Sequence, residues 1–292
     1  MTIAVGIGLA FIAMLCWGFG DFLIQKSTRK LGDWETLFFM TAFGALVLLP
    51  FVWKSIPNLF SAEYSTLWVL AGASVILLAA ALVDFEALRK GKLAIVEPIW
   101  SFEIPTAAFL AFFILGERIS GVQIILVIIL LISLVLVAFR EKQFNARFLM
   151  EKGVIFAIIG AVLMGGANFF MGWGGRVSDP LMVNFVTDVF LMVVTGLGLL
   201  VSGRFNHLFP DLRREYPTLL PMSIADKVAW VAFVFAMSLS PIAIATALSE
   251  SYIIIAVLLG LFVNKEKIQK HQKIGLIGAI ISALVLAIIT SS

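Results

Sequence analysis

The sequence predicts an all-α integral membrane protein with ten transmembrane helices arranged as two inverted five-helix repeats. Three observations lead to this prediction: the apolar composition, ten apolar stretches of spanning length, and an internal repeat. Of the 292 residues, 61% are apolar and only 13% are charged, which is about half the charged share of a soluble domain. A soluble fold of this length needs a charged shell around its core, and these few charges cannot supply one.

Ten segments are apolar enough to cross a bilayer, since a spanning helix needs roughly 20 mostly apolar residues. Charged residues, glycine or proline bound each segment, and the connections between them are too short for a soluble domain. The first segment has no positive leader and continues directly into further spans, so we interpret it as a helix rather than a cleaved signal peptide. The segments are 3–24, 35–53, 67–88, 93–115, 121–139, 153–173, 181–202, 218–238, 242–263 and 273–290.

The two halves of the chain, 1–145 and 146–292, repeat each other. With a shift of about 147 residues, Trp17–Phe22 aligns with Met164–Phe169, so that Gly18 matches Gly165 and Asp21 matches Asn168. With a shift of about 149, Glu117–Ile119 aligns with Glu266–Ile268. Each half has five spans, an odd number, so the second half must enter the membrane from the opposite side. Such inverted repeats are typical of secondary transporters.

These motifs resemble a known family. The Trp17-Gly18 pair in the first segment, and the proline-bearing fourth segment that runs into Leu115-Gly116-Glu117-Arg118-Ile119, are similar to the EamA-like branch of the drug/metabolite transporter superfamily. The resemblance covers essentially the whole chain. It implies a ten-helix carrier with a central cavity between the two repeats.

The basic residues predict an orientation. The loops that follow the odd-numbered spans all lie on one side of the membrane, and 17 of the 21 Lys and Arg fall on that side. The positive-inside rule places this basic side in the cytoplasm, so that both termini would lie outside. The family resemblance implies both termini inside, so the absolute orientation stays open. In either case we expect a multi-pass protein of the cytoplasmic (inner) membrane.

Ionisable residues inside a membrane are costly, at roughly 2.5–3.5 kcal/mol each on insertion scales, so each is a functional candidate by default. Glu250 and Thr246 share one face of the ninth segment, and their repeat counterparts Ser101 and Glu97 share a face of the fourth. A carboxylate in a cavity can hold a proton or a cation, and the nearby hydroxyls can bind a substrate amine. The acids inside segments are Glu103, Asp188, Asp226 and Glu250, with Asp21, Asp84, Glu86 and Glu97 nearer the ends.

The one clear intramembrane base is Lys227, which follows Asp226 directly in the eighth segment. Adjacent helical residues point about 100° apart, so we expect Lys227 to neutralise an acid on another helix. Asp84 and Glu86 are close enough to the next loop to meet its bases. In the tenth segment, small residues permit close helix contact, either within the chain or in a dimer.

Aromatic rings beside carboxylates suit an organic cation, through cation–π attraction worth about 2 kcal/mol when desolvated. Five rings lie close to the acidic or glycine positions, namely Trp17, Trp100, Trp173, Trp230 and Tyr252. The predicted substrate-binding residues are Glu250, Glu103, Glu97, Asp226, Lys227, Trp17, Trp100, Trp230, Tyr252, Asn168, Ser101 and Thr246. We expect them to lie between spans 3, 4, 8 and 9, with spans 1 and 6 as moving gates.

Other functions lack their sequence signatures. No phosphate-binding loop, metalloprotease motif or nucleophile elbow is present, and the single Cys16 and two histidines offer no usual metal cluster. We therefore expect no enzyme, no cofactor and no nucleic-acid partner. The sequence predicts a secondary transporter for a small organic metabolite or drug, amine-bearing or cationic, with protons as a candidate coupling ion. An uncoupled facilitator, an amino-acid exporter, a channel and an intramembrane lipid-modifying enzyme remain as alternatives, and the oligomeric state is open.

Overall fold

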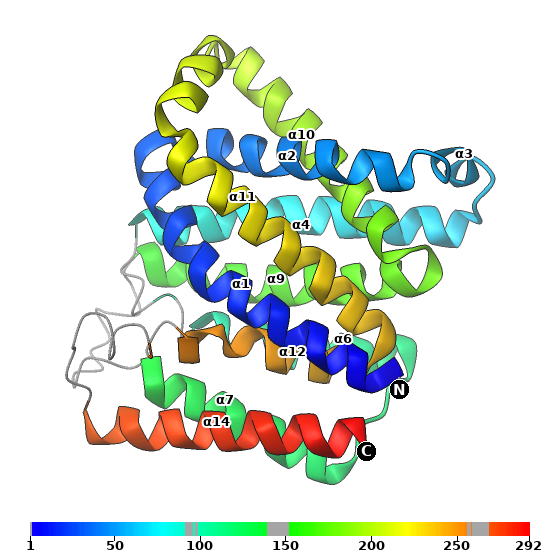
Figure 1. Ribbon diagram of the computed structural model, residues 1–292, viewed down its shortest axis with the longest axis vertical. Coiled ribbons are helices and arrows are strands. Elements are labelled where there is room, and N and C mark those ends of the chain that lie inside the picture. The colour runs from blue at the N-terminus through cyan, green and yellow to red at the C-terminus, as the bar shows by residue number, and fades with distance from the viewer. Residues whose placement is uncertain (1, 91–95, 97–98, 139–151, 256–257, 259–268) are drawn as a thin grey trace.

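The computed structural model describes residues 2–90, 96, 99–138, 152–255, 258 and 269–292, and the regular elements within them are all helical (Figure 1). In chain order they are α1 (Thr2–Leu31), α2 (Asp33–Val52), α3 (Ile56–Leu59), α4 (Tyr64–Lys90), α6 (Glu103–Leu115), α7 (Gly121–Ala138), α9 (Lys152–Val177), α10 (Pro180–Val201), η1 (Phe205–His207), α11 (Leu208–Leu239), α12 (Ile242–Ser249), η2 (Glu250–Tyr252) and α14 (Lys270–Ser291). An all-helical fold suits a bilayer because each helix satisfies its own backbone hydrogen bonds.

Seven of the described helices are long and apolar enough to cross a membrane, and three shorter apolar helices accompany them. The seven match expected spans 1, 2, 3, 6, 7, 8 and 10. The shorter ones, Glu103–Leu115, Gly121–Val137 and Ile242–Ile255, fall in expected spans 4, 5 and 9, parts of which lie outside the described residues. The all-α membrane architecture is confirmed, and the full count of ten crossings stays a prediction.

Helix pairing follows the repeat. The first helix of each half packs on the third helix of the other, as α1 on α11 and α9 on α4. The second helices, α2 and α10, pack on each other, as do the fifth helices, α7 and α14, and the fourth helices α6 and α12 are also in contact (Figure 1). Two units related by a two-fold axis in the membrane plane produce this pattern. The fold therefore fits the expected inverted repeat.

Two helices are longer than the apolar segments that predicted them. Helix α1 continues to Leu31, and α11 begins at Leu208, ten residues before the expected start. Both extensions carry charges, and Lys30 of α1 lies 2.7 Å from Glu215 of α11. A helix can continue past the apolar stretch because its backbone bonding does not depend on hydropathy. Hydropathy therefore predicts the crossing but not the full helix.

Both fourth helices are interrupted at the same place in the repeat. Residues 99 and 100 are helical, a turn follows at Ser101 and Phe102, and α6 then begins at Glu103. In the second half, α12 ends at Ser249 and the tighter η2 covers Glu250–Tyr252. The shift of about 149 residues places one interruption on the other. Discontinuous helices at equivalent positions of two repeats mark the substrate site in many transporters.

The fourth segment contains two prolines, Pro98 and Pro105. Pro105 is the third residue of α6, within the first turn of a helix, where backbone N–H groups have no intrahelical acceptor. It therefore costs no helical hydrogen bond, and the break falls before it rather than at it. Pro98 lies outside the described residues.

The small residues of the tenth span face α7 within the chain. A Cβ added at Gly275 would lie 2.7 Å from the Ser133 carbonyl oxygen and 2.9 Å from the Val137 amide nitrogen. At Gly278 it would lie 2.6 Å from the Ser133 hydroxyl. Such close backbone approach is what small residues provide in membranes. This face serves an intrachain contact, which decides between the two possibilities that the sequence left open.

At the end of the bundle near the N-terminus, Arg176 joins the two halves. Its Nη1 donates to Glu117 Oε2 at 2.9 Å, and its Nε and Nη2 donate to the carbonyl oxygens of Met237 and Ser240, each at 2.9 Å. Glu117 reaches this position because α6 ends at Gly116, whose φ of 64° is the left-handed conformation that closes helices. We call this set of contacts the arginine clamp.

Candidate functional site

A cavity of about 120 Å³ lies at the centre of the bundle. Both repeats line it, through α1, α2, α4 and α6 of the first half and α9, α10, α11 and η2 of the second. The lining includes six acids, namely Asp21, Asp84, Glu103, Asp188, Asp226 and Glu250. All except the half-buried Asp21 are buried. The cavity therefore concentrates acidic groups in an apolar protein.

Nine of the twelve predicted site residues line this cavity. They are Trp17, Trp100, Glu103, Asn168, Asp226, Lys227, Trp230, Glu250 and Tyr252. Ser101 and Thr246 are buried but are not part of the lining, and their hydroxyl oxygens have no hydrogen-bond partner among the described residues. Glu97 lies outside the described residues.

The base Lys227 is paired with an acid on another helix, as its sequence predicts. Its Nζ lies 2.8 Å from Oδ1 and 2.6 Å from Oδ2 of Asp188 on α10. Both side chains are at least nine-tenths buried. Gly44 of α2 covers the pair so closely that a Cβ there would overlap both partners. Three helices thus enclose one buried ion pair in the cavity wall.

Two equivalent contacts connect the first helix of each repeat to the interrupted helix of the other. On one side, the amide Nδ2 of Asn168 in α9 donates to Glu103 Oε2 at 3.2 Å. On the other, the hydroxyl of Tyr252 in η2 hydrogen-bonds Asp21 in α1. Asn168 and Asp21 align in the repeat, as do Tyr252 and Glu103. Each repeat therefore forms a side-chain hydrogen bond at the equivalent position, but the residue types that form the bond differ.

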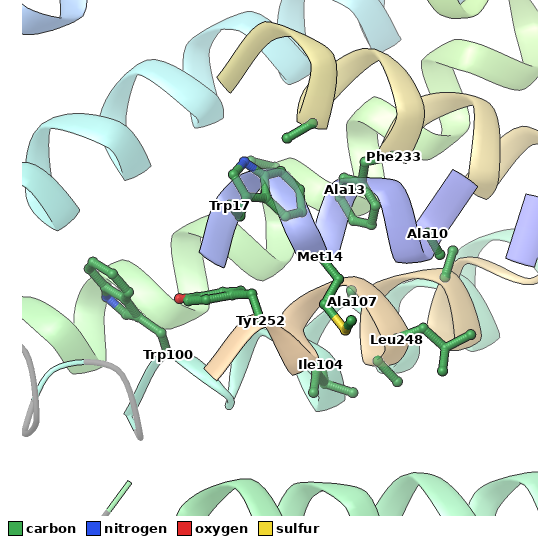
Figure 2. Close-up of a cluster of buried hydrophobic side chains, with 14 of the residues drawn as sticks. Ala10, Ala13, Met14, Trp17, Trp100, Ile104, Ala107, Phe233, Leu248 and Tyr252 are labelled. Carbon is green, nitrogen blue, oxygen red and sulfur yellow. The ribbon is translucent and has the colours of Figure 1, made fainter. Parts of the chain in front are cut away.

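Aromatic rings form the other part of the wall. Trp17 of α1 meets Trp230 of α11 edge-on, with ring centroids 5.4 Å apart, and meets Phe233 in the same way at 5.0 Å. Figure 2 shows Tyr252 between Trp17 and Trp100 in this view. Edge-to-face packing of this kind fixes ring orientation. Rings of fixed orientation therefore form part of the wall that also carries the acids.

The site is wider than the sequence predicted, because α2 and α10 also line it, in addition to the four expected spans and to spans 1 and 6, which carry the predicted Trp17 and Asn168. Four lining residues were not among the predicted binding residues, namely Asp21, Asp188, Thr41 and Asn184. A usable signal was present, since Asp21 aligns with Asn168 and Thr41 with Asp188 in the repeat. When the two repeats are related by a two-fold axis through the cavity, residues that match in the repeat alignment lie on opposite sides of that axis and line the same cavity.

The expectation that Asp84 and Glu86 both meet nearby loop bases is half wrong. Glu86 does form ion pairs, with Arg89 and with Lys90. Asp84 is buried in the cavity wall, and its Oδ1 lies against Gly160 of α9. The two residues are only two positions apart but point about 200° apart around a helix. One therefore faces the basic helix end and the other faces the protein interior.

Acids outnumber bases in the cavity lining. Against six acids, Lys227 is the sole basic residue among the described residues of the wall, and Asp188 already neutralises it. Within the described part of the chain, no three His, Cys, Asp or Glu residues are grouped so that they could hold a metal ion. Carboxylates and aromatic ring faces, the residue types that attract cations, therefore lie together in this wall.

Comparisons with known proteins agree with this architecture. A family model described as the EamA-like transporter family matches the chain twice, over residues 4–139 and 151–288. No curated protein matches the chain. A solved crystal structure of a protein, 16% identical, is similar with a TM-score of 0.72 over 98% of this chain and 99% of its own, which shows a common fold. The two family matches coincide with the two repeats seen in the sequence.

Proposed function

Because the chain belongs to the EamA-like transporter family, and is thus a membrane transporter of the drug/metabolite type, we propose that it is a secondary transporter for small organic cations that carry an amine. The observation that supports this proposal is the excess of buried acids over bases in one aromatic-walled cavity. A buried acid needs either a proton or a cationic partner. An amine supplies the partner, and protons supply the alternative when the cavity is empty.

We further propose a ten-span topology in the cytoplasmic membrane, with transport by alternating access. Support comes from helix pairing between the repeats, from the interrupted fourth helices and from the arginine clamp that connects the halves at one end. Rocking one repeat against the other would break contacts at one end of the cavity and form them at the other. The asymmetric distribution of basic residues supports the assignment of the lysine-rich side to the cytoplasm.

The test uses purified protein in liposomes and uptake of radiolabelled 1-aminobutane. Glu250→Gln removes a cavity carboxylate with little change in shape, so uptake should be abolished while the circular dichroism spectrum is retained. Glu215→Gln is the matched control, because Glu215 pairs with Lys30 near the helix ends and is not in the cavity lining. Normal uptake by Glu250→Gln would show that this acid has no role in transport.

A screen of thermal stability would test the ligand class independently. A ligand at about 100 times its Kd stabilises the folded state by about 2.7 kcal/mol. We expect stabilisation by amines and not by sugars or organic anions. Stabilisation by anions alone would contradict the proposal and would make Lys227 the binding residue to test.

A further inference from the structure

The acids of the cavity fall into two groups that differ in their charge balance. Asp188 and Asp226, together with Lys227, form the lysine end, on α10 and α11. The other acids form the lysine-free end, which consists of Asp21 of α1, Asp84 of α4, Glu103 of α6 and Glu250 of η2. In Figure 1, α2 lies above α4 and α9, α6 and α12 lie below them, and α1, α10 and α11 run obliquely across these levels.

The lysine end keeps one negative charge when its groups are ionised. Lys227 is paired with Asp188 at 2.6 Å, so the charge of Asp226 is left over. Asn184 provides a second acceptor in the same wall. Its Nδ2 donates to the Pro180 carbonyl oxygen, but its Oδ1 has no partner among the described residues, although the side chain is 1% exposed. The amide oxygen can accept a hydrogen bond and the carboxylate attracts positive charge, so one ammonium group could satisfy both residues of this wall.

The lysine-free end has no base in its described surroundings. The charged groups that act on Glu103 are Glu250, Asp84 and Asp21, all of them acids. The charged groups that act on Glu250 are again Asp21 and Asp84. Repulsion among clustered carboxylates favours any cation that enters. Asp226 also acts on Asp21, so the two groups meet at Asp21, and Glu103 and Glu250 form a second acidic set with only acids as charged neighbours.

The remaining lining is suited to a carbon chain. Leu77 and Ala81 of α4, Met164 and Met171 of α9 and the ring of Trp17 all face the same cavity. Apolar walls bind methylene groups by removing them from water. A ligand with an apolar middle and a charge at each end satisfies both acid groups and the wall together.

We propose that the preferred substrate is a linear aliphatic diamine, with one ammonium group at the lysine end and the other at the lysine-free end of the same cavity. This inference rests on the proposed function as an amine transporter. It assigns Asp226 and Asn184 to one ammonium, and Glu103 and Glu250 to the other. A monoamine can satisfy only one of the two ends.

The experiment compares 1,4-diaminobutane with 1-aminobutane, which share the same carbon chain and differ by one ammonium. Equilibrium binding to the purified full-length protein should give a Kd about tenfold lower, or lower still, for the diamine, because a second buried charge pair adds to affinity. Equal Kd values would overturn the diamine proposal and leave the amine transporter in place. If neither compound binds, the proposed function fails as well.

Variants at the two ends make the test specific. Asp226→Asn and Glu250→Gln should each bring the Kd of the diamine close to that of the monoamine. Glu215→Gln, outside the cavity, should keep the wild-type ratio of the two Kd values. A wild-type ratio in Asp226→Asn would overturn the assignment of the lysine end. If Glu250→Gln does not fold, Glu250→Asp keeps the charge and should bind the diamine better than the monoamine; loss of that preference would contradict the proposal.

Discussion

The buried ion pair between Asp188 and Lys227 allows a quantitative prediction. Its side chains are 8% and 7% exposed, and Nζ lies 2.6 Å from the nearer carboxylate oxygen. Removing one partner of such a pair costs about 3–5 kcal/mol of folding free energy, because the other charge stays buried without compensation. We therefore expect Lys227→Met to destabilise the protein by about 3 kcal/mol or more. Asp188→Asn should also destabilise the protein, since it leaves the buried Lys227 ammonium without its ion-pair partner.

The double variant Asp188→Asn, Lys227→Met should be more stable than Lys227→Met alone. A pair replaced by neutral groups of similar size is often neutral in stability, so the coupling energy should be about 2–3 kcal/mol, near the upper end for contacting residues. Equilibrium unfolding in mixed micelles, followed by circular dichroism, measures all four corners of the cycle. Additivity of the two single costs within about 0.5 kcal/mol would refute the reasoning.

Three further predictions concern close contacts. Gly44→Ala should lower the melting temperature because its methyl group would overlap the buried ion pair, whereas Gly8→Ala, with open space around its Cβ, should not; equal melting temperatures would contradict this packing. Arg176→Lys should cost about 1.5–3 kcal/mol, since an ammonium cannot reproduce the three bonds of the arginine clamp. Unfolding measurements would check this, and an unchanged free energy would mean that the clamp is not rigid. Gly275→Leu should separate α14 from α7 and lower the melting temperature, while Ile274→Leu, at a side chain that is 67% exposed, should leave it unchanged.

Among the features of the sequence, the internal repeat carries the most information about the site. It aligns Asp21 with Asn168, and each of these residues contacts the interrupted helix of the other half. It also aligns Ser101 with Glu250, which lie at the two helix interruptions. Symmetry makes such positions equivalent in space, even though their side chains differ.

The sequence predicted that Lys227 pairs with an acid on another helix, but it did not predict which acid. Helical geometry excluded the adjacent Asp226 and so required an acid on another helix. The choice of Asp188 came from the packing of α10 on α11 and from the room that Gly44 leaves beside them. In the same way, the sequence did not indicate that Asp84 faces the cavity while Glu86, two residues later in α4, faces the surface.

By itself the sequence determined the membrane class, the approximate spans and the two repeats, because a bilayer demands about 20 apolar residues per crossing and repeats are visible as matched residues. Only the tertiary structure decided which acids share a cavity, which face of α14 meets α7 and where the fourth helices break. These features depend on how helices rotate about their axes and pack across the chain. Hydropathy indicates which segments can cross a bilayer, but it does not indicate which neighbour a residue meets.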